Sequence, residues 1–229
     1  MNWSWKREAP HLLLVAAIVI SSAVAWPFVE EPVPVHWNAR GEVDGYGSRF
    51  EALGLMPIVV VGLYLLLAFI PKVDTARANY ASFSGAYSVI RFTTLLTMVA
   101  IQGALIAAAL GYAGAPGWFI PAGVGVLFIV LGNVMGKIRP NYFAGIRTPW
   151  TLASVRSWDA THRLGGRVFA GAGVLLIAMA VVRQEWFVIA GLVAMFGGLG
   201  WTVVYSYLVW KRDPDRVPVT GTLPAPPEE

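Results

Sequence analysis

Apolar residues run along this chain in long blocks that short polar stretches separate. A helix that crosses a membrane needs about 20 mostly apolar residues, because the hydrocarbon core is about 30 Å thick. Six blocks meet this requirement, and the turn-rich stretch 111–117 divides two of them. The blocks are 11–29, 52–71, the two parts of 92–136, 168–182 with a short extension back to 164, and 186–210. The pattern predicts an all-α polytopic membrane protein with six transmembrane helices.

Composition agrees with this prediction. Of the 229 residues, 57% are hydrophobic and 13% are charged, against roughly 25% charged in an ordinary soluble domain. The chain has no cysteine, which excludes disulfides and thiolate metal sites. The first block could also be read as a cleavable signal peptide, because Lys6 and Arg7 precede it and "AVA" follows at 23–25. We expect a retained helix instead.

Lysine and arginine are distributed unevenly between the two sides of the predicted bundle. With six spans both termini share one side, and that side carries 14 of the 17 basic residues; the other three are Arg40, Arg49 and Arg183. Because cytoplasmic loops carry the excess of basic residues, we expect both termini in the cytoplasm and the loop 30–51 outside. The Pro-rich tail 213–229 is expected to be disordered.

The predicted spans are poor in ionisable groups. None of the six blocks contains Asp, Glu, Lys or Arg apart from Arg167 in the short extension. Ion-coupled transporters usually carry such a group inside the membrane, so the pattern argues against a proton-driven pump. We predict no cofactor, and selective chemistry should be confined to the two ends of the bundle.

The outer loop, "EEPVPVHWNARGEVDGYGSRFE" at 30–51, is expected to be ordered. Its prolines disfavour helix and its glycines favour turns, so we predict an extended segment followed by turns. The candidate ligand-binding residues are His36, Trp37, Asn38, Gly41 and Asp44. They could recognise a cationic or amphipathic ligand by indole stacking and imidazole hydrogen bonding. The plain alternative is an interfacial Trp anchor with a histidine that caps a turn. A metal site from His36, Glu42 and Asp44 would have loose spacing, and we predict none.

The inner loop, 137–167, is expected to contain a short interfacial helix at about 152–164. Thr151 would cap its start, and glycines at 165 and 166 would end it. Trp158 and His162 would share one face, while Asp159 would pair with arginines three or four residues away. Since no nucleophile is specified beside His162, no catalytic residue is predicted and an enzyme is the less favoured interpretation. We also expect Asn141, Arg147 and Thr148 to hold the loop together by hydrogen bonds to its own backbone.

Residues 132–173 carry a motif that resembles the Sdp immunity protein family, SdpI-like bacterial membrane proteins. The matching positions are Gly132, Asn133, Lys137, Pro140, Asn141, Gly145 to Thr151, Trp158 and Thr161 to Arg163. The first half of the chain is similar to the companion domain of unknown function in that family. Its motif is matched here by Pro34, His36, Trp37, Asn38, Gly41 and Asp44. The resemblance implies a six-helix protein of the bacterial cytoplasmic membrane that protects a cell from a secreted peptide toxin. In some operons this role is coupled to holding a cytoplasmic repressor at the membrane.

Three hypotheses follow. The first is a receptor-like immunity or signalling protein, in which a three-helix half (1–112) presents the outer loop and a second half (113–212) presents the inner loop. The second is a membrane enzyme or a lipid-headgroup-binding protein that uses the inner loop, and the third is an accessory subunit of a membrane complex. The inner candidates for contact with a partner or a headgroup are Asn141, Arg147, Thr148, Trp150, Thr151, Trp158, His162 and Arg163. The expected partners are the lipid bilayer, a secreted peptide toxin outside, and a cytoplasmic repressor or anionic lipid inside, with no direct nucleic acid.

Overall fold

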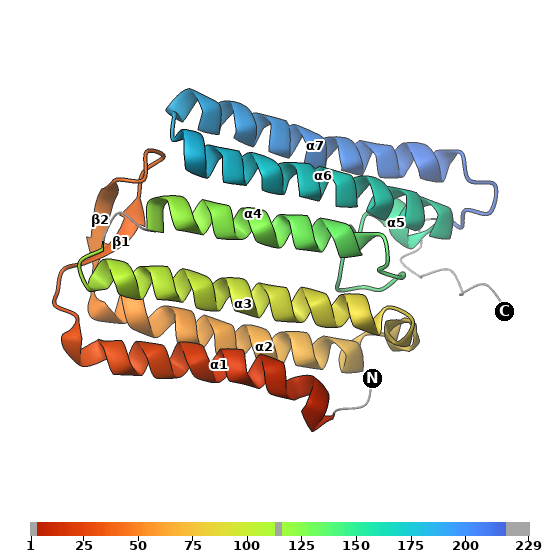
Figure 1. Cartoon of the computed structure of the whole chain (residues 1–229). Helices are drawn as coiled ribbons and strands as arrows, with labels where there is room; N and C mark the ends of the chain where they lie inside the picture. The colour runs from red at the N-terminus through yellow and green to blue at the C-terminus, as the bar shows by residue number, and fades with distance from the viewer. Residues whose placement is uncertain (1–3, 113–115, 219–229) are drawn as a thin grey trace.

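The structure is a computed structural model that describes residues 4–112 and 116–218. Within these ranges it contains six long helices, one short helix and one two-stranded sheet (Figure 1). The long helices are α1 (Trp5–Ala25), α2 (Leu55–Val73), α3 (Ser84–Ala109), α4 (Pro116–Met135), α6 (Val155–Val182) and α7 (Glu185–Lys211). The short elements are β1 (Val33–Trp37), β2 (Val43–Gly47) and α5 (Pro149–Leu152). Short 3-10 or π turns lie at 26–28, 50–54 and 77–81.

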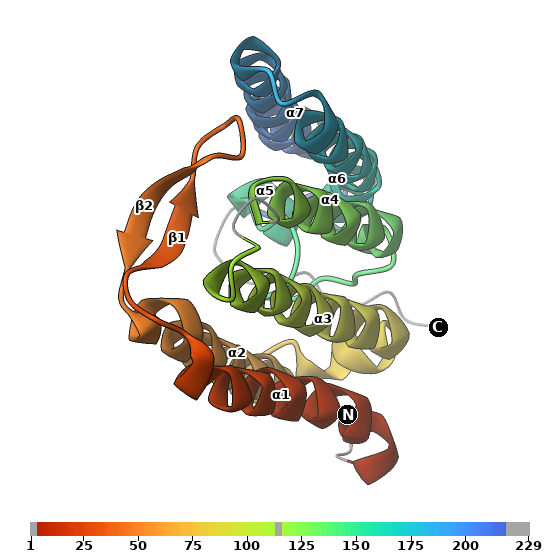
Figure 2. The ribbon, with the colours of Figure 1, turned by 60° about the vertical axis from the view of Figure 1, so that its left-hand side comes forward.

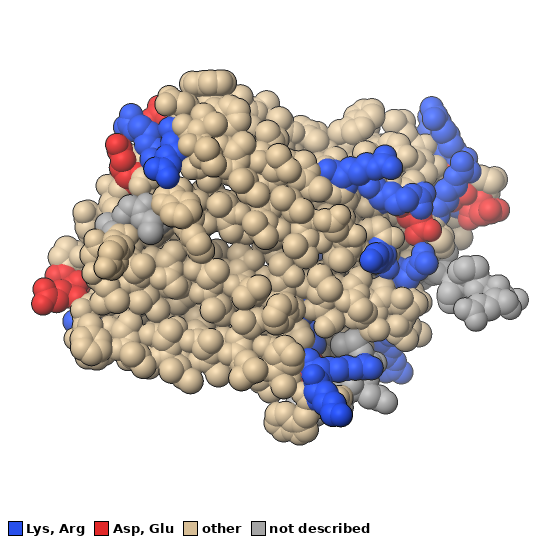
Figure 3. Space-filling view, in the orientation of Figure 1, with Lys and Arg blue, Asp and Glu red and all other residues tan. Residues whose placement is uncertain are grey.

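The prediction of six transmembrane helices is confirmed, since all six long helices are long and apolar enough to cross a membrane. The face shown in Figure 3 has a broad band without charged side chains between two charged ends. Large apolar side chains such as Leu65, Val193 and Phe196 are exposed on the long helices, as expected where lipid takes the place of water. We call the end that carries β1 and β2 the hairpin end. The loop end is the opposite one, with residues 137–154 and both ends of the described chain (Figure 1).

The helices form a curved row rather than a ring. In Figure 2, α3 and α4 lie in the middle, α1 and α2 lie at one edge, and α7 lies at the other beyond α6. The closest packing joins α4 to α6, where Gly125 faces Gly173 and Gly132 faces Gly166. A Cβ on Gly132 would stand 2.5 Å from the carbonyl oxygen of Gly166, so only glycine permits this approach. Small residues allow such contact between membrane helices.

The segment 30–51, expected to be the outer loop, forms an antiparallel hairpin across the end of the helix row. Strand β1 pairs with β2, with irregular register around His36. Val33 anchors β1 in a buried cluster with Val29, Ala52 and Leu53. The tip crosses from the α1–α3 side to the start of α7, where Arg40 pairs with Glu185 at 3.4 Å (Figure 2). The hairpin therefore contacts both halves of the chain.

The short helix before α6 lies at boundaries other than the expected 152–164. Thr148, rather than Thr151, caps α5, and Ser154 caps α6, which continues without a break to Val182. Gly165 and Gly166 do not end a helix, because they lie inside α6 and let it approach Met135 and Gly132 of α4. Asp159 also differs from expectation, since its partner is Arg139 at 3.7 Å.

The first residues of the expected disordered tail contact the loop end. Asp213 is buried and accepts a hydrogen bond from the Ser154 hydroxyl. The Val217 amide donates to the carbonyl oxygen of Ala153 at 3.1 Å. Residues 213–218 thus form part of the described structure, whereas 219–229 lie outside the described residues.

Candidate functional site

Asn141 is the centre of the loop end. Its side chain is fully buried, and its Oδ1 accepts hydrogen bonds from the backbone amides of Phe143 at 2.9 Å and Ala144 at 2.6 Å. Its Nδ2 donates to the carbonyl oxygens of Arg139 at 2.8 Å and Ala144 at 3.1 Å. A buried backbone group without a partner is costly, and this one amide satisfies four such groups. Asn141 therefore fixes the course of the loop.

The turn between α2 and α3 holds this loop from the other half of the chain. Asp74 accepts hydrogen bonds from the Tyr80 hydroxyl at 2.9 Å and from the Tyr142 amide at 3.1 Å. Asn79 donates to the carbonyl oxygen of Pro140 at 2.8 Å. Burial, together with the hydrogen bond to Asp74, raises the pKa of Tyr80, so this hydroxyl remains a donor. These contacts join the two halves at the loop end.

Trp158 and His162 lie one turn apart on α6, and their rings stack on each other. Their ring centroids are 4.1 Å apart and both side chains are fully buried. Trp158 donates from Nε1 to the carbonyl oxygen of Ile138 at 2.8 Å. His162 Nε2 lies 3.0 Å from the Ile146 amide and Nδ1 lies 2.8 Å from the carbonyl oxygen of Trp158. An amide can only donate, so Nε2 accepts and Nδ1 carries the proton, which makes the ring neutral.

Gly145 makes the contact between the loop and His162 possible. Its φ is +99°, a conformation that residues with a Cβ rarely adopt. A Cβ at this position would also overlap Nε2 of His162. Glycine is therefore required here both for backbone geometry and for space.

The two threonines of the loop cap α5. Thr148 and Thr151 form a reciprocal capping box, and the Thr148 hydroxyl lies 3.0 Å from that of Ser206 on α7. Thr151 also donates to the carbonyl oxygen of Ile146 at 2.9 Å. Trp150 is half-buried and meets the ring of Tyr207 edge-on at 5.3 Å. The loop is thus attached to α7 as well as to α6.

The expectation that Asn141, Arg147 and Thr148 hold the loop by hydrogen bonds to its own backbone is confirmed. Arg147 supplies the third contact, from Nη1 to the carbonyl oxygen of Tyr142 at 2.7 Å. The candidate residues Asn141, Thr148, Thr151, Trp158 and His162 are all buried. Of the inner candidates, Arg147 and Arg163 are exposed. The loop is sealed by its own side chains.

The hairpin end presents its polar residues differently. His36 Nδ1 lies 2.5 Å from Asp44 Oδ1, and their side chains are 72% and 42% exposed. Gly45 lies opposite His36 across the hairpin, where a Cβ would stand 2.8 Å from that of His36. Trp37, next along the strand, is half-buried. The pair is positioned by the strands but keeps its outer surface open.

The tip of the hairpin is built around Asn38. Its Oδ1 accepts hydrogen bonds from the amides of Arg40 at 2.9 Å and Glu42 at 3.1 Å, and Gly41 takes a φ of +81°. The hydrogen bond from the Asn38 side chain, and then the charge of Arg40, lower the pKa of Glu42. Asn38 and Gly41 therefore shape the turn, and His36 and Asp44 are left facing outward.

No group of three or more His, Asp or Glu side chains is arranged to hold a metal ion within residues 4–112 and 116–218. The possibility weighed above, a metal held by His36, Glu42 and Asp44, is not formed. Glu42 is engaged with Asn38 and Arg40 instead.

An ion pair inside the bundle was missed by the sequence reasoning. Glu8 of α1 and Arg91 of α3 are buried and form a double contact at 2.9 and 2.7 Å, with the Tyr64 hydroxyl 3.2 Å from Glu8. The hydropathy pattern predicts spans that begin at residues 11 and 92, which places both charges in loops. The structure corrects this, because α1 and α3 begin earlier and carry the charges inward. No local pattern joins the two residues, which lie 83 positions apart in the sequence.

Two family models match this sequence, one at the segment that forms the loop end and one at the segment that forms the hairpin end. A model of the SdpI/YfhL protein family matches residues 137–206, which hold the sealed loop, α6 and most of α7. The domain of unknown function DUF1648 matches residues 12–61, which hold the hairpin. The immunity protein SdpI of Bacillus subtilis (strain 168) is 21% identical over 207 residues, covering 90% of this chain and 97% of that protein.

The model of the SdpI/YfhL protein family covers residues 137–206, whereas the similarity to SdpI extends over most of the chain. The chain is an SdpI-like bacterial membrane protein, in agreement with its six apolar helices. No solved structure matches it. The family motif at the loop end is largely buried, whereas the matched segment at the hairpin end includes the exposed His36–Asp44 pair.

Proposed function

We propose that this protein is a membrane immunity protein that protects a bacterium from an extracellular peptide toxin. The similarity to the immunity protein SdpI extends over nearly the whole of both chains, which favours a shared role. The observation that carries the proposed mode of action is the exposed His36–Asp44 pair. Both side chains are exposed at the hairpin end, where a molecule from solution can reach them.

We further propose that the hairpin end faces outside and the loop end faces the cytoplasm. The distribution of basic residues supports this orientation, since 14 of 17 belong to the side that carries the termini. A peptide arriving from outside would then meet the hairpin first. The toxin would contact His36, Trp37 and Asp44, while Asn38 and Gly41 hold the turn.

A toxin with basic and apolar groups suits this surface. The Asp44 carboxylate offers hydrogen-bond acceptors and the His36 ring offers a polar nitrogen. Tyr46 and Phe28, at the same end, expose aromatic surface for apolar contacts. A peptide that otherwise inserts into the bilayer would be bound here by polar and apolar contacts together.

Relay to a cytoplasmic partner is a finer part of the proposal. The hairpin contacts both the 1–112 half and, through Arg40 and Glu185, the 113–212 half. A bound peptide could change the relation of the halves only by binding one arrangement more tightly. A partner such as a repressor would detect the changed arrangement by contact with the exposed Arg147. Toxin-dependent crosslinking at position 147 would support this relay, and equal crosslinking with and without toxin would refute it.

The sealed loop argues against a catalytic or headgroup-binding centre at Asn141, Arg147 and His162. The polar atoms of Asn141 and His162 are directed to backbone groups inside the protein, and neither side chain is accessible. A substrate would have to displace the hydrogen bonds that define the loop. Immunity is therefore the better supported function.

A competition experiment tests the proposal. The gene is removed from its own host, and the deletion strain is mixed with the parent that secretes the toxin. We expect the deletion strain to be lost, and to be rescued by the wild-type gene but not by the His36→Ala, Asp44→Ala variant at equal membrane abundance. The Glu30→Gln variant, an exposed substitution at the same end, serves as the control. Undiminished survival of the deletion strain would contradict the immunity role.

A further inference from the structure

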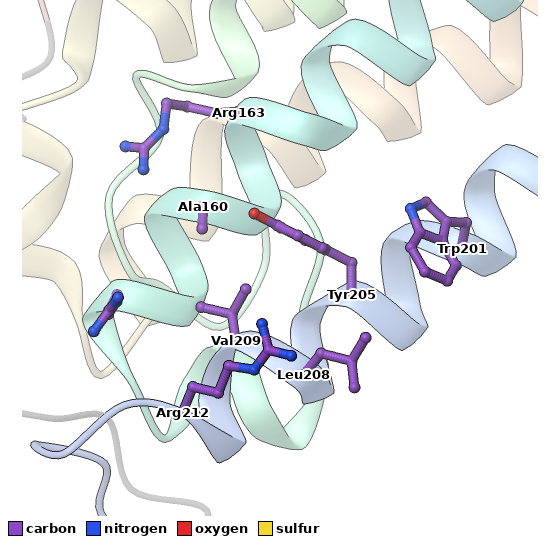
Figure 4. A pocket seen from close by; sticks show the side chains of 8 residues that line it. Ala160, Arg163, Trp201, Tyr205, Leu208, Val209 and Arg212 are labelled. Atoms are coloured by element: carbon purple, nitrogen blue, oxygen red, sulfur yellow. The ribbon is translucent and has the colours of Figure 1, made fainter.

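A groove separates α6 from α7 at the loop end, away from the sealed loop motif. Its main cavity has a volume of about 530 Å³, and a second hollow of about 240 Å³ continues it towards the middle of the bundle. The lining residues are Arg156, Ala160, Arg163, Leu164, Arg167, Trp201, Tyr205, Leu208, Val209 and Arg212. Figure 4 shows Tyr205 reaching from α7 towards Ala160 on α6.

Two matching rows of side chains form the walls. On α6 the row is Arg156, Ala160, Arg163 and Arg167, and on α7 it is Trp201, Tyr205, Leu208 and Arg212. Both rows follow the spacing of four, three and four residues, which keeps side chains on one face of a helix. Because Ala160 is small, the middle of the seam is not filled. The sequence thus specifies a basic wall facing a mainly apolar and aromatic one.

The charges of this groove are not balanced by the protein. Within residues 4–112 and 116–218, Arg156, Arg163, Arg167 and Arg212 form no ion pair. The acid of α6, Asp159, pairs with Arg139, and Asp213 receives the Ser154 hydroxyl. Figure 4 shows the Arg212 side chain extending alongside Val209. Four guanidinium groups on one seam leave their hydrogen-bonding capacity for a ligand.

The depth of the arginine row identifies the chemistry of that ligand. Arg156 stands at the start of α6, and Arg167 lies eleven residues further, roughly 16 Å along the helix axis. An unpaired arginine below a membrane surface is costly unless it reaches headgroups or water, and guanidinium binds phosphate oxygens in a paired geometry. Trp201 is exposed at the deeper part of the groove, where tryptophan suits the boundary between headgroups and acyl chains.

We infer that the groove between α6 and α7 is a binding site for an anionic phospholipid. The phosphate lies among Arg156, Arg163 and Arg212, and an acyl chain descends past Leu164 and Trp201. The site is independent of the immunity role, since it neither includes nor touches the hairpin. Of the inner-loop residues expected to contact a headgroup, Arg163 lines this groove, whereas Asn141 and His162 do not.

Native mass spectrometry of the purified full chain, titrated with phosphatidylglycerol or phosphatidylcholine, tests this site. We expect preferential retention of phosphatidylglycerol. The R156Q/R212Q variant should weaken its binding about 10- to 30-fold. The K6Q/R77Q variant removes two exposed charges from the same end outside the groove and should change binding less than about twofold. The Ala160→Leu variant keeps every charge but fills the groove, and should also weaken binding.

Several results would overturn the inference. Equal losses in R156Q/R212Q and K6Q/R77Q would mean general attraction to the basic end, and equal binding of the two lipids would exclude recognition of the charge. A thermal shift with inorganic phosphate but none with phosphatidylglycerol would assign the groove to a free anion. Binding of polyglutamate without lipid binding would assign it to an acidic protein. Circular dichroism of each variant separates these outcomes from loss of folding.

Discussion

The two ends of the bundle use polar residues in opposite ways. At the loop end, Asn141 and His162 are buried and form hydrogen bonds with backbone groups of the loop. At the hairpin end, His36 and Asp44 contact each other but remain largely exposed. Both ends carry dense polar motifs, yet only at the hairpin end is the histidine of the motif exposed. A polar motif can therefore hold the backbone at one end of a membrane protein and keep its polar side chains exposed at the other.

The difference follows from the backbone that each motif serves. The loop end is a chain without regular structure packed against helix ends, so its carbonyl and amide groups need side-chain partners. The hairpin satisfies many of its own backbone groups through the pairing of β1 and β2. Its side chains are then free to face solvent.

The largest effect is expected from breaking the ion pair inside the loop end. Glu8→Gln leaves Arg91 buried without its counter-charge, and should lower the free energy of unfolding by about 3–5 kcal/mol. Thermal unfolding in detergent measures the change. The control is Glu30→Gln, an exposed position at the hairpin end. Equal stability of the two variants would show that the buried pair does not hold α1 to α3.

A somewhat smaller effect is expected from a methyl group at the contact between loop and helix. Gly145→Ala must adopt a φ of +99° and push His162 away from Ile146, at a cost of about 2–4 kcal/mol. Gly171→Ala is the matched control, because nothing lies within 4 Å of a Cβ there. We expect that control to match the wild type or exceed it by up to about 1 kcal/mol. If Gly145→Ala were as stable as the wild type, the geometry of the loop would not explain the glycine at this position of the motif.

Trp158→Phe sharpens the comparison further. It keeps most of the stacking on His162 but removes the donor to the carbonyl oxygen of Ile138. Leaving that buried acceptor without a partner should cost about 1–3 kcal/mol. Trp201→Phe, at an exposed ring, should cost less than about 0.5 kcal/mol. The same loss at both positions would mean that the hydrogen bond adds nothing.

The smallest effect on stability is expected at the hairpin end. His36→Ala and Arg40→Gln alter exposed pairs, and each should change the free energy of unfolding by less than about 1 kcal/mol. His36→Ala should nevertheless abolish protection in the competition experiment. If His36→Ala unfolded the protein, His36 would have a structural role like that of the loop-end residues, and the proposed difference between the two ends would be wrong.

Much of this architecture was predictable from the sequence. Hydropathy identified six spans, and residue types such as Asn141 and Thr148 indicated hydrogen bonds to the loop backbone. The continuity of α6 was not predictable, because glycines such as Gly165 normally mark a helix end, and only the close approach of α4 explains them. Nor was the contact between Glu8 and Arg91, since the two residues are far apart in sequence and each stands beside an apolar block.

Labelling of single cysteines in intact cells tests the central claim, that the hairpin end meets the toxin outside while the loop end is a sealed clamp. The chain has no native cysteine, so Tyr46→Cys and Phe143→Cys, at exposed positions of the two ends, each provide one reactive site. We predict that a membrane-impermeant maleimide labels position 46 but not 143, and that toxin slows labelling at 46. Labelling at 143 from outside, or a rate at 46 that toxin does not change, would contradict the account.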